Sequence, residues 1–138
     1  MTPVRSTATG TTTHLLQGST WEAEAYRRAL ALKDMPDDWD RPRSRKPTIL
    51  AVNAALTYIQ RVAGLELFAI SSPFIAPMSN GGVQLEWSHG QRQLEIELLP
   101  DGAACFVTSA AGDVTEGDLG DASSPDVKSL FGWLAATP

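Results

Sequence analysis

The sequence predicts an α+β fold in which helices cover one face of an antiparallel sheet. Two stretches with helical spacing occupy the N-terminal half, a run of alternating apolar and polar residues extends from Gly81 to Gly102, and Ser124-Pro125 opens a last apolar helix. With 138 residues and 43% hydrophobic residues, the chain has the size and composition of one globular domain. We expect an unstructured tail over residues 1–18, rich in Thr, Ser and Gly, and a single α+β domain over 19–138.

Two N-terminal helices are expected, over residues 20–33 and from Pro47 to about residue 64. Ser19 precedes Glu22 by three residues, which is the spacing of a capping box. The second stretch, PTILAVNAALTYIQRVAGL, carries no charge before Arg61 and is therefore expected to be a main core element. Prolines and aspartates between the two helices predict a loop, and we expect Trp39 to anchor that loop in the core.

A meander of three or four antiparallel strands should follow these helices. Residues 83–88 and 93–98 alternate apolar with polar side chains, and a turn at His89-Gly90 would place Leu85 opposite Leu94 and Glu86 opposite Gln93. A third strand is expected over 103–110 and a fourth over 112–119, while the prolines of SSPFIAPMS indicate an extended edge segment. The C-terminal helix, over about 126–137, is expected to pack on one face of this sheet.

Three glutamates of this hairpin, Glu86, Glu95 and Glu97, fall on the side opposite its apolar residues. Paired carboxylates divide acid and base roles when their environments separate their pKa values, and this requires a cleft. Alternating glutamate also keeps the wet face of a half-buried sheet soluble. We therefore interpret the three side chains as a solvated or docking face, with no catalytic residue among them.

No cofactor or metal site is predicted. His14 lies in the expected tail and His89 at a hairpin tip, so the two histidines do not supply the convergent ligands that a metal needs. The one cysteine, Cys105, is mid-strand and is interpreted as a small buried hydrophobe. The sequence contains no G-x-S-x-G elbow and no phosphate-binding glycine loop.

Charge is distributed unevenly along the chain. The net charge of −5 combines +3 up to Arg61 with −8 from Val62 onward. An acidic body repels phosphate backbones over most of the surface. The exception is the basic cluster of Arg41, Arg43, Arg45 and Lys46, which we interpret as a solvated loop between two helices, because four charges are a weak footprint. No apolar run reaches the ~18 residues of a membrane span. The start of the chain lacks the apolar region of a secretory signal, and a single cysteine suits a reducing compartment, so a cytoplasmic protein is expected.

The segments DDWD, PFIAPMSNGGVQLEW, LEIELLPDG and EGDL occur in this order between about residues 30 and 120. They resemble a group of small uncharacterised bacterial proteins with a Trp-Asp segment followed by a Gly-Gly-x-x-Leu-Glu-Trp hairpin. The chain departs from that pattern at Asn80, where Asp is usual, and in the basic RPRSRKP. The resemblance implies a bacterial or phage origin and a cytoplasmic location, and it brings no established activity or catalytic residue.

The sequence thus favours a non-enzymatic protein-interaction module, antitoxin-like or an accessory of a defence system against viruses. Another protein would bind at the sheet edge or the acidic face, and the −8 charge of the C-terminal part would steer it toward a basic partner; a homo-oligomer is left open. A small enzyme using paired carboxylates and weak nucleic-acid contact through residues 41–46 are the alternatives. The candidate partner-binding residues are Glu86, Glu95, Glu97, His89, Arg41, Arg43 and Arg45.

Overall fold

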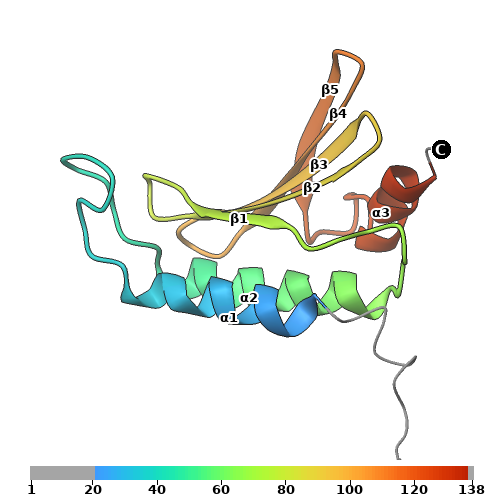
Figure 1. Ribbon diagram of the computed structural model, residues 1–138. Helices are drawn as coiled ribbons and strands as arrows, with labels where there is room; N and C mark the ends of the chain where they lie inside the picture. The colour runs from blue at the N-terminus through green and yellow to red at the C-terminus, as the bar shows by residue number, and fades with distance from the viewer. Residues whose placement is uncertain (1–20, 137–138) are drawn as a thin grey trace, which may run out of the picture.

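The computed structural model describes residues 21–136 and shows an α+β fold (Figure 1). The predicted tail over 1–18 lies outside the described residues. In chain order the elements are α1 (Glu22–Ala31), the short 3₁₀ turn η2 (Leu32–Asp34), α2 (Ile49–Gly64), β1 (Phe74–Pro77), β2 (Val83–His89), β3 (Arg92–Leu98), β4 (Ala104–Ala110), β5 (Asp113–Leu119) and α3 (Val127–Ala135).

The sheet has five antiparallel strands in sequence order, β1-β2-β3-β4-β5, which corrects the prediction of three or four. The extra strand is β1, where the prolines suggested only an extended segment. Its four residues pair with β2, with Phe74 opposite Glu86 and Pro77 opposite Val83. Because proline has no N–H to donate, it is tolerated at the edge of a sheet, and β1 is indeed an edge strand.

The register of the β2–β3 hairpin differs from the predicted one by two residues. Leu85 lies opposite Ile96, and Glu86 lies opposite Glu95 rather than Gln93. The two-residue turn is Gly90-Gln91, with Gly90 at a φ of 61°, because His89 still belongs to the ladder and pairs with Arg92. A shift of two residues keeps every side chain on its predicted face, since the side-chain period of a strand is two.

The core lies between the apolar face of the sheet and the helices. Figure 1 shows α1 and α2 side by side below the sheet and α3 beside it, and both α2 and α3 contact β2 and β3. Trp87 of β2 is buried between aromatic rings, with centroids 4.8 Å from Phe131 of α3 and 6.5 Å from Trp21. The apolar alternation of the hairpin is therefore satisfied entirely on the helical side.

Side-chain caps fix where α2 and α3 begin. The Thr48 hydroxyl accepts from Ala51 N at 3.0 Å and donates to Pro100 O at 2.6 Å, which ties the start of α2 to the β3–β4 turn. Asp126 accepts from Ser129 N at 2.7 Å and caps α3. Of the helices formed by residues 21–136, none has the length and apolar character needed to cross a bilayer.

Candidate functional site

The sheet face turned away from the helices carries carboxylates from three strands, β2, β3 and β5. The register places Glu86 opposite Glu95, Gln84 opposite Glu97, and Cys105 between Glu97 and Asp118. Glu116 lies opposite Val107, the neighbour of Glu95. We call this surface the acidic face and define it by five residues: Glu86, Glu95, Glu97, Glu116 and Asp118.

Sequence reasoning found three of these five carboxylates. It missed Glu116 and Asp118, which belong to β5, because the sequence alone does not set the pairing of the strands after residue 103. The signal was present, since the two residues alternate with Gly117 and Leu119 in the same way that the hairpin glutamates alternate with Leu and Ile.

Crowding on the acidic face raises the pKa of Glu95 to about 7. The largest cause is a side-chain hydrogen bond with Glu97, which requires a proton on one of the two carboxyls. Partial burial of Glu95 and repulsion from the charges of Glu97 and Glu86 add to it. Glu95 therefore carries a proton for part of the time near neutral pH. A positive charge bound next to these carboxylates would offset their repulsion and favour the release of this proton.

Cys105 lies in a shallow hollow of about 320 Å³ on this face, beside Glu97, Glu116 and Asp118. Its Sγ is 3.8 Å from Glu97 Oε1. Burial raises the pKa of the thiol, and the neighbouring carboxylates raise it further. A raised thiol pKa lowers the thiolate fraction at neutral pH, which is the opposite of what a nucleophilic cysteine requires.

The basic residue of these strands lies on the other side of the sheet. Arg92 points to the helical side, donates through Nη1 to Trp133 O, and lies 4.8 Å from the centroid of the Trp133 ring. His89, the candidate residue at the tip of the hairpin, pairs with Arg92 and shares the parity of Trp87, so it lies on the opposite side of the sheet from Glu86. Among strand residues 74–119, the acidic face carries no Lys or Arg.

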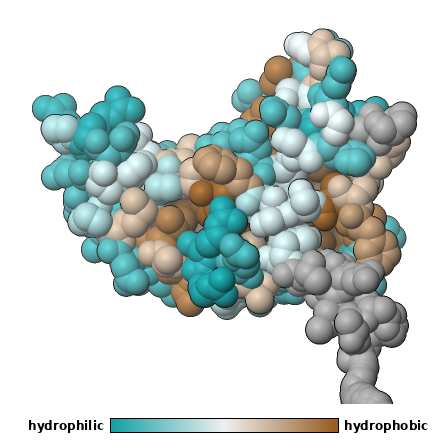
Figure 2. Space-filling model, in the orientation of Figure 1, coloured by the Kyte–Doolittle hydropathy of each residue, from teal (hydrophilic) through white to brown (hydrophobic). Residues whose placement is uncertain are grey.

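The basic cluster lies in the ordered loop between η2 and α2, which forms a hydrophilic lobe at the left of Figure 2. Trp39 does not enter the core as predicted: its Nε1 donates to Arg45 O at 2.8 Å and closes the loop on itself. Asp38 accepts from Arg43 N at 2.7 Å, and Arg41 forms an ion pair with Asp40 at 3.4 Å.

This loop does not join the acidic face. Arg45 forms an isolated bridge with Asn80, which places the loop beside the β1–β2 turn. Asp37, Asp38 and Asp40 precede its four cations in the same loop, so the loop carries a net charge of only +1. Such a small net charge is a weak footprint for phosphate backbones.

Neither the arrangement of the carboxylates nor a comparison with known proteins indicates a chemical activity for the acidic face. Within residues 21–136, no three His, Cys, Asp or Glu side chains converge closely enough to hold a metal ion. Comparison of the chain with family models, with curated proteins and with solved structures gave no match. The resemblance to small bacterial proteins stays a prediction, and the surface itself has to support any function.

Proposed function

We propose that this protein is a non-enzymatic interaction module that binds a basic surface of another protein through its acidic face. The observation that carries the proposal is the set of five carboxylates on a sheet face without Lys or Arg, crowded enough to raise the pKa of Glu95 to about 7. A cationic partner relieves this repulsion, and the gain is specific to partners of opposite charge.

Apolar side chains at both edges of the sheet extend this surface. Phe74 of β1 is 60% exposed and lies opposite Glu86, while Val114 of β5 is 62% exposed and shares the parity of Glu116. Interfaces combine apolar contacts with complementary charge, so these side chains suit a protein partner better than a nucleic acid, whose phosphates the carboxylates repel.

The free edge of β5 offers a second element of the same interface. This edge strand has seven residues without proline, whereas β1 has four residues and ends at Pro77. A partner strand added to β5 would place alternate side chains beside Glu116 and Asp118, and Lys or Arg at those positions would pair with them. Two copies of β5 paired with each other would instead bring their carboxylates together.

The most concrete form of this proposal is an antitoxin-like or defence-accessory role, in which a small acidic protein covers a basic surface of a larger one. Its support is the charge of the face together with the small size of the chain. The basic surface would be one that the larger protein uses for its own activity, so that binding controls this activity.

The test compares three forms of the full chain as bait in an extract of the native host. The face variant carries E86Q, E97Q and E116Q, and the control variant carries E22Q, E24Q and E66Q, which make the same change in net charge outside the sheet. We expect a basic protein that the wild type and the control variant retain and the face variant loses. Retention of the same proteins by all three baits would refute the proposal.

Hydrogen exchange on the resulting complex separates the face from the edge. New protection of β5 amides would show that a partner strand pairs with this edge. Unchanged exchange in β5, with loss of binding in the face variant, would restrict the interface to the side chains of the acidic face.

A carboxylate-based enzyme is the second candidate, and the raised pKa of Glu95 is the observation that favours it. A general acid or base works best when its pKa lies near the working pH. Under this alternative, any hydrolytic activity of the chain should fall at least about a hundredfold in E95Q, as is typical for loss of general acid–base catalysis. An activity that E95Q leaves intact would exclude Glu95 as its acid or base.

A further inference from the structure

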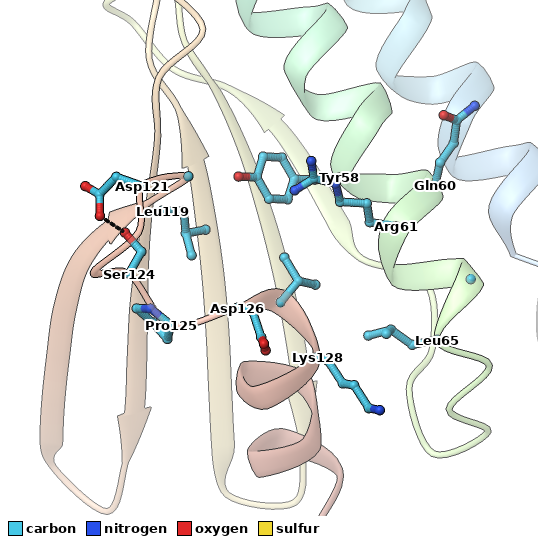
Figure 3. A pocket seen from close by; sticks show the side chains of 13 residues that line it. Tyr58, Gln60, Arg61, Leu65, Leu119, Asp121, Ser124, Pro125, Asp126 and Lys128 are labelled. Atoms are coloured by element: carbon cyan, nitrogen blue, oxygen red, sulfur yellow. Dashed lines mark hydrogen bonds between the residues drawn. The ribbon is translucent and has the colours of Figure 1, made fainter.

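A pocket of the described chain lies away from the acidic face, between the C-terminal half of α2 and the segment that leads from β5 into α3. It has a volume of about 560 Å³, within the range of small-molecule sites (Figure 3). The thirteen residues that line it are Tyr58, Gln60, Arg61, Gly64, Leu65, Leu119, Gly120, Asp121, Ser124, Pro125, Asp126, Val127 and Lys128.

Apolar groups form much of its wall. Leu65 from the end of α2, Leu119 from the end of β5 and Val127 from the start of α3 all line the pocket. The ring of Tyr58 is largely buried, and Figure 3 shows its hydroxyl directed across the pocket towards the end of β5. An apolar ligand body of about ten carbon atoms fits such a wall.

The two carboxylates of the pocket are already occupied by hydrogen bonds within their own segment. Asp121 accepts from Ser123 N at 2.9 Å and from Ser124 Oγ at 3.1 Å, and Figure 3 shows it turned towards Ser124. Asp126 accepts from Ser129 N as the cap of α3. Hydrogen bonds to these serines lower the pKa of both carboxyls, so both stay ionised and bound to their local donors.

The two cations of the pocket are less closely paired, although the charge of Lys128 helps to lower the pKa of Asp126. Neither Arg61 nor Lys128 forms an ion pair with a carboxylate of residues 21–136. The Arg61 guanidinium lies 5.2 Å from the centroid of the Tyr58 ring, a cation–π contact that holds it at the wall. Arg61 is exposed, so its guanidinium at the side of the apolar pocket is accessible to a carboxylate, which guanidinium groups bind through two hydrogen bonds.

We infer that this pocket binds a small amphipathic carboxylate, with its apolar body between Leu65, Leu119 and Val127 and its carboxylate on Arg61. The occupant is a small molecule, because the volume matches a ligand of drug-like or smaller size rather than a protein segment. The site is independent of the acidic face and of the proposed partner.

Titration of the ¹⁵N-labelled full chain with 4-phenylbutyrate tests this inference. We expect saturable amide shifts at Gly64, Gly120 and Val127, with a dissociation constant of about 1 mM or tighter for a ligand of this size. The neutral 4-phenylbutan-1-ol and the cationic 4-phenylbutylamine have the same apolar body and should bind at least about tenfold more weakly, because they lack the charge-assisted hydrogen bonds.

Two variants locate the site. Gly64 lines the pocket, and a Cβ placed there would meet no atom within 4 Å, so we expect the side chain of G64F to enter the pocket mouth and abolish the shifts. R61Q should weaken binding about tenfold. The matched controls are G132F, at another helical glycine with open space around it, and R27Q on α1, and both should bind like the wild type.

Several results would overturn the inference. The first is the absence of saturable shifts up to about 10 mM phenylbutyrate, which is about ten times the expected dissociation constant. The others are shifts that map outside the pocket and binding that survives G64F. Equal affinity for the alcohol would show an apolar pocket without recognition of the carboxylate, and equal affinity for the amine would show that Asp121 or Asp126 dominates.

Discussion

Replacing Glu95 with glutamine should stabilise the protein at pH 8 and change its stability little at acidic pH. The carboxyl of Glu95 has a pKa of about 7 in the folded protein, against an ordinary value of 4.5. The folded state therefore holds this proton more tightly than the unfolded state. The stability that this bound proton contributes is fully present below the pKa of Glu95 in the unfolded state, about 4.5, and is lost as the pH rises through the folded pKa of about 7.

The size of the effect follows from the pKa change and from solvent screening. Taken alone, the difference between 4.5 and about 7 corresponds to about 3 kcal/mol in the free energy of unfolding. Glu95 is only half-buried, so screening reduces this to about 1 kcal/mol. E95Q, which cannot ionise, should therefore gain about 1 kcal/mol over the wild type at alkaline pH, or about 4 °C in Tm for a domain of this size.

Urea denaturation followed by tryptophan fluorescence measures this difference, at about pH 4 and about pH 8 and constant ionic strength. The control is E66Q, an exposed glutamate in the loop after α2 that removes the same charge away from the sheet. Groups common to both proteins cancel in the comparison. A gain for E95Q no larger at high pH than at low pH, or an equal gain for E66Q, would refute the crowding of carboxylates on this face.

Three further substitutions test the packing that positions the face. F131A removes a fully buried ring stacked edge-on against Trp87 and should cost about 3–5 kcal/mol in urea denaturation, whereas a loss below about 1 kcal/mol would contradict its central place in the core. G82A would place a Cβ 2.5 Å from Leu98 O, so we expect a loss of about 1–3 kcal/mol, and an unchanged denaturation midpoint would show that this close approach is wrong. T48A removes the cap of α2 and should cost about 1–2 kcal/mol, to be compared with T48S, which keeps the hydroxyl and should cost much less.

The helix and strand pattern was predictable because apolar spacing reports directly on burial. The alternation around Leu85 and Ile96 placed the correct side chains in the core even though the turn was assigned one residue too early. Two glutamates that lie opposite each other on neighbouring strands repel and cost energy. The predicted turn at His89-Gly90 avoids this cost, because it places Glu86 opposite the neutral Gln93. The structure instead pairs Glu86 with Glu95, and a proton on Glu95 reduces the cost.

Long-range placement was not predictable from local pattern. The pairing of β1 with β2 depends on contacts across the connection between them. The prolines of the β1 segment argued against a strand there. The isolated Trp39 gave no indication that its indole would bond to Arg45 O instead of entering the core. The pocket at Arg61 joins residues more than fifty positions apart in the sequence, and no motif marks them.

The most direct test of the acidic face is the affinity of its captured partner, measured by titration calorimetry. Removal of three charges in the E86Q, E97Q and E116Q variant should weaken binding about tenfold to a hundredfold, while the E22Q, E24Q and E66Q variant should bind like the wild type. The difference should shrink as salt rises from about 50 to about 300 mM, because screening acts on the same charges. Equal affinities of the two variants at low salt would contradict the proposed role of this face.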